Sequence, residues 1–279
     1  MLGGSMATRL GQDAIERFRR DGVAHLPGVL PEPWLTRFRQ AWEWSMANPG
    51  PLASALVPGR DDGRQDLCNP KALTQYQSAL LQSPLADLTA SLWGEQDVWF
   101  MYEQVFHKTA GGSARTPWHQ DSSYLTVDGT HLLVMWITFE AIPAELSLEF
   151  VRGSHVGPLF NTSRFDVADP TLPIFESEQL PRLPHVEAQR DAFDIVSYAV
   201  QPGDVVVFHP STLHGGGPTD AQNPVRRTLT LRFFGPDARF AARPGRAGPF
   251  YPEVQRNLSE GEPFRHPRFL KLRQAGVDS

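Results

Sequence analysis

The chain has 279 residues, of which 41% are hydrophobic, and its formal net charge is -5 at pH 7. This length allows either one large β-rich domain or two smaller domains. The 26 lysines and arginines are scattered along the chain, so the basic patch of a nucleic-acid-binding protein is absent and we expect no nucleic-acid partner.

The single cysteine, Cys68, excludes an internal disulfide framework and thiolate-rich metal sites, and it fits a reducing compartment. No apolar run reaches the roughly 18 residues of a membrane span, and no signal-peptide pattern is visible. We therefore expect a soluble, cytoplasmic protein without a membrane partner. Residues 1–5 resemble a short added leader ahead of a native start at Met6, and we treat residues 6–279 as a single domain.

The first third of the chain, to about residue 94, is predicted to be mainly helical. Apolar residues recur at helical spacing in four segments, and a short apolar strand is expected over 23–26 after the first of them. The predicted helices cover 13–20, about 31–47, 71–81 and 84–92. The interval 48–70 is rich in Pro, Gly and Asp without a sustained period, which predicts a surface loop.

The segment from about 95 to 240 is rich in β-branched and aromatic residues, which predicts strands. We expect strands over 98–107, 131–140, 146–151, 195–200, 205–209 and 226–234. Most are separated by turns or loops, which favours antiparallel sheets closing into a sandwich or barrel, followed by a C-terminal extension over 241–279. The proline-rich interval 157–194 has no clear strand pattern and is a candidate lid.

The strongest functional signal is the sequence Pro-Trp-His-Gln-Asp at 117–121. Successive side chains on a strand alternate between faces, so His119 and Asp121 are predicted to point the same way and to hold one metal ion. The best candidate for a third ligand is His214, with His209 and His155 as alternatives. Two histidines and one carboxylate suit non-haem Fe(II) and leave coordination positions open for chemistry.

Arg226 and Arg227 begin the last predicted strand, and alternation allows only one of them to point into a barrel. An inward arginine needs an anionic partner, and a bound dicarboxylate would accept two parallel hydrogen bonds from its guanidinium. A pair of surface arginines at the strand end is the alternative.

Together these residues resemble the phytanoyl-CoA dioxygenase family, whose members are Fe(II)- and 2-oxoglutarate-dependent oxygenases with a double-stranded β-helix core, also described as jelly-roll or cupin-like. The resemblance covers most of the chain. It is carried by 18–30 (FRRDGVAHLPGVL), 118–121 (WHQD), 135–137 (MWI), 152–155 (RGSH), 202–204 (PGD), 214–215 (HG) and 226–227 (RR). Arg152 stands where the family usually has proline, so no substrate is carried over.

The resemblance implies that His119, Asp121 and His214 bind iron and that Arg226 holds the distal carboxylate of 2-oxoglutarate. It places Trp136 near the co-substrate, with ordinary core packing as the alternative. Lys108 resembles a lysine often seen before a Gly-rich turn in this family, with a solvent-facing lysine as the alternative. Related halogenases have a small residue at the position of Asp121, so the resemblance favours oxygen transfer over halogenation.

The expected function is hydroxylation of a C–H bond in a small-molecule substrate, with O2 consumed and succinate and CO2 released. Two other classes of protein remain as alternatives. One is a non-catalytic cupin-like barrel that binds a small acid through Arg226, and the other is a zinc-type metal hydrolase that uses the same three ligands.

Overall fold

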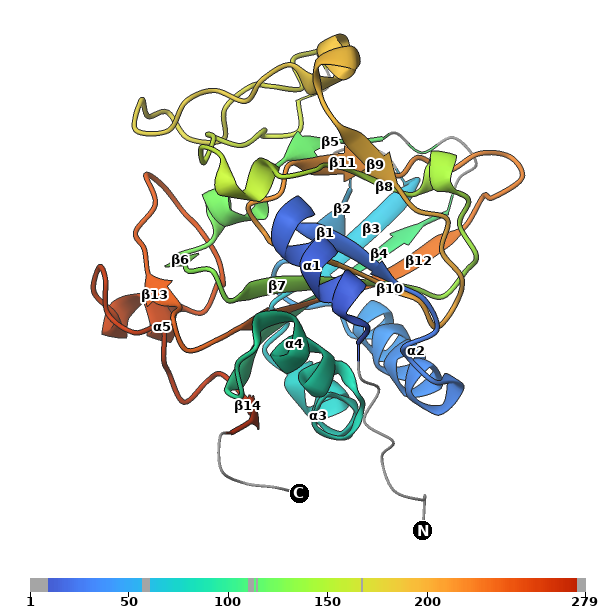
Figure 1. Cartoon of the computed structure of the whole chain (residues 1–279), viewed down its shortest axis with the longest axis vertical. Helices are drawn as coiled ribbons and strands as arrows, with labels where there is room; N and C mark the ends of the chain where they lie inside the picture. Colours follow the sequence, from blue (N-terminus) through green and yellow to red (C-terminus); the bar gives the residue numbers. More distant parts are fainter. Residues whose placement is uncertain (1–9, 57–60, 110–112, 114, 167, 275–279) are drawn as a thin grey trace.

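Two antiparallel sheets face each other and enclose the interior of the protein (Figure 1). The computed structural model describes residues 10–56, 61–109, 113, 115–166 and 168–274, so the leader expected at 1–5 lies outside the described residues. The large sheet has eight strands in the order β1-β10-β7-β12-β4-β3-β2, with β14 paired to β4. Its strands are β1 (Val23–Leu26), β2 (Ser54–Ala55), β3 (Gly63–Leu67), β4 (Val98–Lys108), β7 (Leu132–Thr138), β10 (Val205–Phe208), β12 (Arg226–Phe234) and β14 (Lys271–Arg273).

The small sheet lies opposite the large one and has the order β5-β11-β8-β9. Its strands are β5 (Thr116–His119), β8 (Leu148–Val151), β9 (Ile195–Ser197) and β11 (His214–Gly216). A separate pair, β6 (Val127–Asp128) and β13 (Arg239–Phe240), lies to one side of the two sheets. Two antiparallel sheets preceded by helices confirm the predicted fold class.

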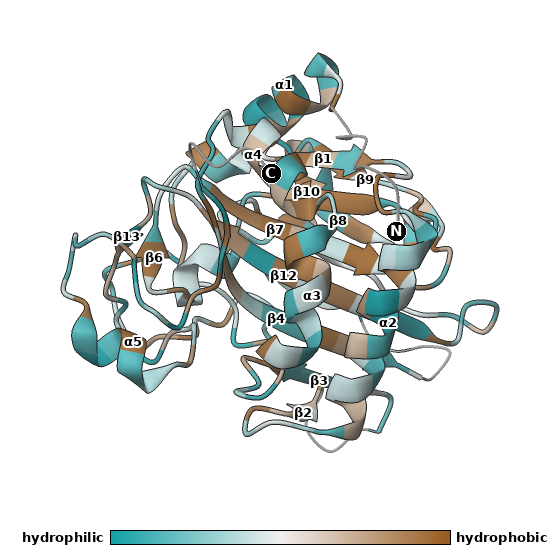
Figure 2. Ribbon diagram, turned by 90° about the horizontal axis from the view of Figure 1, so that it is seen from below, coloured by the Kyte–Doolittle hydropathy of each residue, from teal (hydrophilic) through white to brown (hydrophobic). Residues whose placement is uncertain are grey.

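Helices cover the outer face of the large sheet (Figures 1 and 2). They are α1 (Gln12–Asp21), α2 (Glu32–Ala47), α3 (Leu73–Gln82) and α4 (Leu85–Trp93), whereas a short α5 (Pro252–Asn257) lies to one side beside β13. The first four match the predicted helices within about two residues, because each has an apolar face that packs in the main core. None of the helices in the described part of the chain is long and apolar enough to cross a membrane.

Strand β12 illustrates how the sequence separates the core from the interior of the barrel. Leu229, Leu231 and Phe233 belong to the hydrophobic core shared with the helices. The alternate positions carry polar side chains that are also buried, namely Arg226, Thr228, Thr230 and Arg232. Because successive side chains of a strand point to opposite faces, this second set lines the space between the sheets.

Two predictions about loops and strands are wrong in detail. The interval 48–70, predicted to be a loop, contains β2 and β3, and β3 pairs with β4. Its sequence Gly-Arg-Gln-Asp-Leu has no hydrophobic alternation, so backbone pairing near the sheet edge is what makes it a strand. The predicted strand around residue 119 ends at His119, because Asp121 opens a 3-10 turn over Asp121–Tyr124.

Candidate metal and anion site

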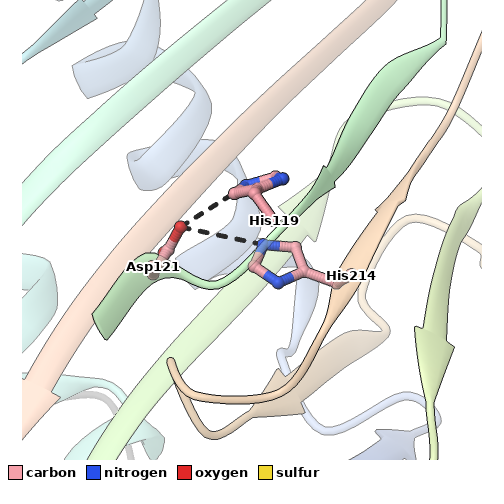
Figure 3. Close-up of side chains that lie close together, drawn as sticks. All are labelled: His119, Asp121 and His214. Atoms are coloured by element: carbon pink, nitrogen blue, oxygen red, sulfur yellow. Dashed lines mark ion pairs between the residues drawn. The ribbon is translucent and has the colours of Figure 1, made fainter. Parts of the chain in front are cut away.

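Two side chains from the small sheet and one from the turn after β5 lie close together inside the barrel (Figure 3). His119 is the last residue of β5 and is paired with His214, the first residue of β11. Asp121 lies two residues after His119. Oδ1 of Asp121 lies 3.5 Å from Nε2 of His119 and 3.7 Å from Nε2 of His214. All three residues are buried, and their ligand atoms lie within 4.8 Å of one another, so they could hold a metal ion.

Hydrogen bonds set the orientation of both imidazoles. Nδ1 of His119 lies 2.8 Å from the carbonyl oxygen of Pro117, and Nδ1 of His214 lies 2.9 Å from that of Thr212. Each Nδ1–H donates to a carbonyl, so each Nε2 presents its lone pair toward Asp121. Burial, followed by the neighbouring His119, lowers the pKa of His214 to about 3. The donor set is therefore two imidazoles and a carboxylate, which fits Fe(II).

Asp121 is held from the opposite sheet by Arg232 of β12. Oδ2 of Asp121 accepts hydrogen bonds from Nη2 of Arg232 at 2.7 Å and from Nε at 3.2 Å, while the hydroxyl of Tyr124 donates to Oδ1. Burial alone would raise the pKa of Asp121, but the charge of Arg232 and contacts with the two histidines lower it well below its ordinary value. The carboxylate is thus ionised and ready to bind a cation.

A second polar group lies at the other end of β12, where Arg226 is paired with Lys108 of β4. Both side chains are buried. Lys108 Nζ donates to the carbonyl oxygen of Gly217 at 2.7 Å, and Arg226 donates to the same oxygen and to that of Leu146 at 2.7 Å. Burial lowers the pKa of Arg226 to about 10, and burial followed by the charge of Arg226 lowers that of Lys108 to about 7. Two cations therefore share one desolvated site.

Gly217 links the two cations to the metal ligands, since it lies three residues after His214. Its backbone has φ +71°, which favours glycine, and a Cβ atom there would lie 2.6 Å from Nη1 of Arg226. Any larger residue would both strain the turn and displace the guanidinium.

The remaining predicted residues have distinct places. Trp136 on β7 is buried and packs with Phe150 and Phe208, whose rings contact His214. Arg227 is directed away from Arg226 and donates from Nε to Glu140 at 2.5 Å. The alternative ligands His209 and His155 lie beside each other, with tilted rings whose centroids are 5.9 Å apart, and both lie outside the cluster of three.

Four contacts of the site were not predicted. Arg232 and Tyr124 hold Asp121, as described above, and Phe165 from the predicted lid lies edge-on to His119 with ring centroids 5.2 Å apart.

The amide of Gln120 connects the start of the same lid to the segment before His214, because its Nε2 donates to the carbonyl oxygen of Ser211 and its Oε1 accepts from the backbone N–H of Phe160. Alternation along β12 would have found Arg232, since it has the same parity as Arg226.

A family model described as phytanoyl-CoA dioxygenase (PhyH) matches residues 18–228, which is most of the chain. The chain belongs to the phytanoyl-CoA dioxygenase family. This confirms the resemblance inferred from the motifs, and the matched region begins at Phe18 and includes all three residues of the cluster. A comparison with curated proteins found no match.

Solved structures similar to this family member include two, SnoK and SnoN, that are described as non-haem and dependent on α-ketoglutarate, which is 2-oxoglutarate. The carbocyclase SnoK from nogalamycin biosynthesis has a TM-score of 0.72 at 21% identity, covering 97% of this chain and 99% of SnoK. The epimerase SnoN in complex with Fe3+, alpha ketoglutarate and nogalamycin RO has a TM-score of 0.66 at 19% identity, covering 94% and 98%. EvdO2 from Micromonospora carbonacea var. aurantiaca, complexed with 2-oxoglutarate, has a TM-score of 0.58 at 21% identity, covering 87% and 97%. The likeness establishes a shared fold.

Proposed function

We propose that this chain is an Fe(II)- and 2-oxoglutarate-dependent dioxygenase that hydroxylates a C–H bond of a small molecule and releases succinate and CO2. The observation that carries the proposal is the combination, inside one barrel, of a His-Asp-His cluster with a buried pair of cations, Lys108 and Arg226. Family membership and the cofactors bound by SnoN and EvdO2 support the same reading.

His119, Asp121 and His214 would hold the metal through two Nε2 atoms and Oδ1. Three protein ligands leave further coordination positions for the co-substrate and O2, which is the requirement for this chemistry. The second nitrogen of each imidazole is hydrogen-bonded to the backbone, so neither ring would need to reorient when the metal binds.

Arg226 would bind the distal carboxylate of 2-oxoglutarate, with Lys108 adding a second positive charge. Among the described residues Arg226 has no carboxylate partner, and its guanidinium donates only to backbone carbonyls. A carboxylate is a much better acceptor for a guanidinium than a peptide oxygen, because the hydrogen bonds become charge-assisted and parallel. The structural feature that supports an anionic co-substrate is therefore the buried Arg226 guanidinium, which has no carboxylate partner among the described residues.

When bound, Fe(II) and 2-oxoglutarate together supply the oxidising chemistry, with one oxygen atom of O2 going to succinate and the other to the substrate. The chain's own contribution is to fix the ligands and to exclude water. Trp136, Phe150 and Phe208 form an apolar wall beside His214, and Phe165 covers His119 from the lid. These aromatic groups would limit the access of water to the metal.

The proposal is tested with purified, metal-free protein that is reconstituted anaerobically with Fe(II) and 2-oxoglutarate. We expect tight, stoichiometric binding of both, followed by succinate release when O2 is admitted. Arg226→Met should weaken co-substrate binding by about 100-fold but retain the metal, whereas Arg227→Met on the same strand should retain both. Zinc retention with hydrolysis of ester substrates would instead indicate a hydrolase, and binding of 2-oxoglutarate without metal or turnover would indicate a non-catalytic barrel.

A further inference from the structure

We propose that Arg232 is a positioning residue of the metal site, which holds one oxygen of Asp121 across the barrel so that the other faces the two histidines. This inference rests on the proposed metal site but not on the choice of co-substrate or reaction. Arg232 belongs to β12 of the large sheet, whereas Asp121 follows β5 of the small sheet. Their ion pair therefore spans the interior at the depth of the metal ligands.

The geometry of the pair assigns a different task to each carboxylate oxygen. Nε and Nη2 of Arg232 both donate to Oδ2 of Asp121, at 3.2 Å and 2.7 Å. Oδ1 is the oxygen that faces His119 and His214, at 3.5 Å and 3.7 Å from their Nε2 atoms. Oδ2 is held by two donors of Arg232 and Oδ1 accepts a hydrogen bond from Tyr124, so the orientation of the carboxylate is fixed with Oδ1 toward both histidines, and the structure favours binding of a metal through Oδ1.

The guanidinium is itself fixed by its neighbours. Tyr102 of β4 is the cross-strand partner of Arg232, and the Arg232 guanidinium carbon lies 4.7 Å from the centre of its ring. Stacking on an aromatic ring restrains the plane of a guanidinium in a way that an ammonium group would not reproduce. Arg232 is only 4% exposed, and its plane is thus set by the fold before any metal binds.

An arginine whose role is only to stabilise the fold would be expected to donate every guanidinium hydrogen bond to a protein acceptor, because a buried donor without an acceptor lowers the free energy of unfolding. Nη1 of Arg232 has no hydrogen-bond partner in the described part of the chain. The hydrogen bonds that Arg232 makes there go to Asp121 alone. Its placement is therefore explained by the carboxylate and not by a wider structural network.

The test measures the binding of Co(II) to the metal-free chain, with the absorption spectrum of bound cobalt as a report on ligand geometry. Substitution of a residue that hydrogen-bonds to a metal ligand weakens metal binding by about 10–100-fold, and we expect this loss for both Arg232→Lys and Arg232→Gln, together with an altered cobalt spectrum. The lysine variant keeps the charge and loses the fork of donors, so it separates positioning from charge balance. Arg227→Lys is the matched control, because it alters an arginine–carboxylate pair on the same strand that contains no metal ligand.

Wild-type Co(II) affinity and spectrum in Arg232→Lys would overturn the proposal, as would loss of thermal stability in both variants with unchanged affinity. If neither variant folds, labelled arginine Nε–H groups in the wild-type chain are followed during Zn(II) titration. One solvent-protected Nε–H resonance should shift as zinc binds, and constant resonances would refute the proposal. Wild-type chain that binds cobalt but never oxidises 2-oxoglutarate refutes the proposed function alone, whereas a wild-type chain that binds no metal refutes both.

Discussion

Arg226 and Arg232 lie on the same face of β12, and both are buried, but their charges are balanced in different ways. Arg232 is paired with Asp121 at 2.7 Å, whereas Arg226 donates only to backbone carbonyls among the described residues. A buried charge without a counter-ion is unfavourable unless a ligand supplies one. The comparison distinguishes a buried cation that is paired with a carboxylate of the protein from a buried cation that has no carboxylate partner among the described residues.

The largest effect is expected from Asp121→Ala, which should abolish metal binding and also leave Arg232 buried without its partner. Breaking a buried ion pair from one side costs about 3–5 kcal/mol of unfolding free energy. Asp194→Ala is the control, since its pair with Arg152 is solvent-exposed and such pairs contribute about 0–1 kcal/mol. Urea denaturation of the metal-free proteins measures both, and similar losses would mean that Arg232 does not depend on Asp121 for its charge balance.

Glu103 on β4 is a buried carboxyl group like Asp121, but its pKa is shifted in the opposite direction. Burial raises its pKa to about 7, although the backbone N–H of Asn69 donates to it at 2.9 Å. The folded-state pKa lies above the unfolded value near 4.5. The protonated Glu103 therefore contributes to the free energy of unfolding below pH 4.5, and this contribution is lost as the pH rises through 7. The shift corresponds to roughly 3 kcal/mol.

Glu103→Gln cannot ionise and keeps an acceptor for Asn69, so it should lose less stability than the wild-type chain between pH 4.5 and pH 8. Parallel denaturation curves at several pH values provide the measurement. Equal pH dependence in the two proteins would show that Glu103 ionises in the folded state as easily as in the unfolded chain.

Arg226→Met tests the uncompensated cation. We expect the affinity for 2-oxoglutarate to fall by about 100-fold, because two charge-assisted hydrogen bonds are lost. The unfolding free energy should change by no more than about 1 kcal/mol, since replacing a buried charged group by an apolar one of similar volume is often neutral. Calorimetric titration of the metal-loaded protein and urea denaturation measure the two quantities. A large loss of stability with unchanged affinity would make Arg226 a structural residue.

The grouping of His119, Asp121 and His214 was predictable, because it depends on residue spacing along the chain and on position within the strands. His119 and Asp121 are separated by one residue, and Gln120 between them is extended, so both side chains face inward even though the strand ends at His119. The contact of Asp121 with Arg232 was not predictable from spacing, since it depends on how the two sheets face each other. Parity along β12 would have placed Arg232 inside, but no local pattern indicates which side chain it meets there.

The burial of Lys108 is a second feature that the sequence alone could not predict. Its alternative reading as a solvent-facing lysine is wrong, because β4 extends to Lys108 and pairs it with Arg226 inside the barrel. Hydrophobic patterning cannot predict a buried lysine, since patterning assigns charged residues to the surface. Strand β3, which lies next to the edge strand β2, escaped detection for a related reason, since its sequence is polar and it is defined by backbone pairing with β4 and β2.

The buried Lys108 leads to the smallest expected effect, which is a pH dependence of co-substrate binding. Burial and then the charge of Arg226 lower the pKa of Lys108 to about 7, with Asp62 raising it and Arg115 lowering it further. The ammonium is charged below this value and neutral above it, so raising the pH removes one of the two cations that face the anion. Affinity for 2-oxoglutarate should therefore fall about tenfold between pH 6 and pH 9, and bound anion should move the midpoint upward.

Lys108→Met provides the matched comparison, because titration of every other group affects both proteins alike. The variant should bind 2-oxoglutarate about tenfold more weakly than the wild-type chain at pH 6 and equally well at pH 9. A constant ratio of the two affinities across this range would show that Lys108 does not change its charge near the ligand. In that case Arg226 would be the cation that distinguishes this end of β12 from the end that holds Asp121.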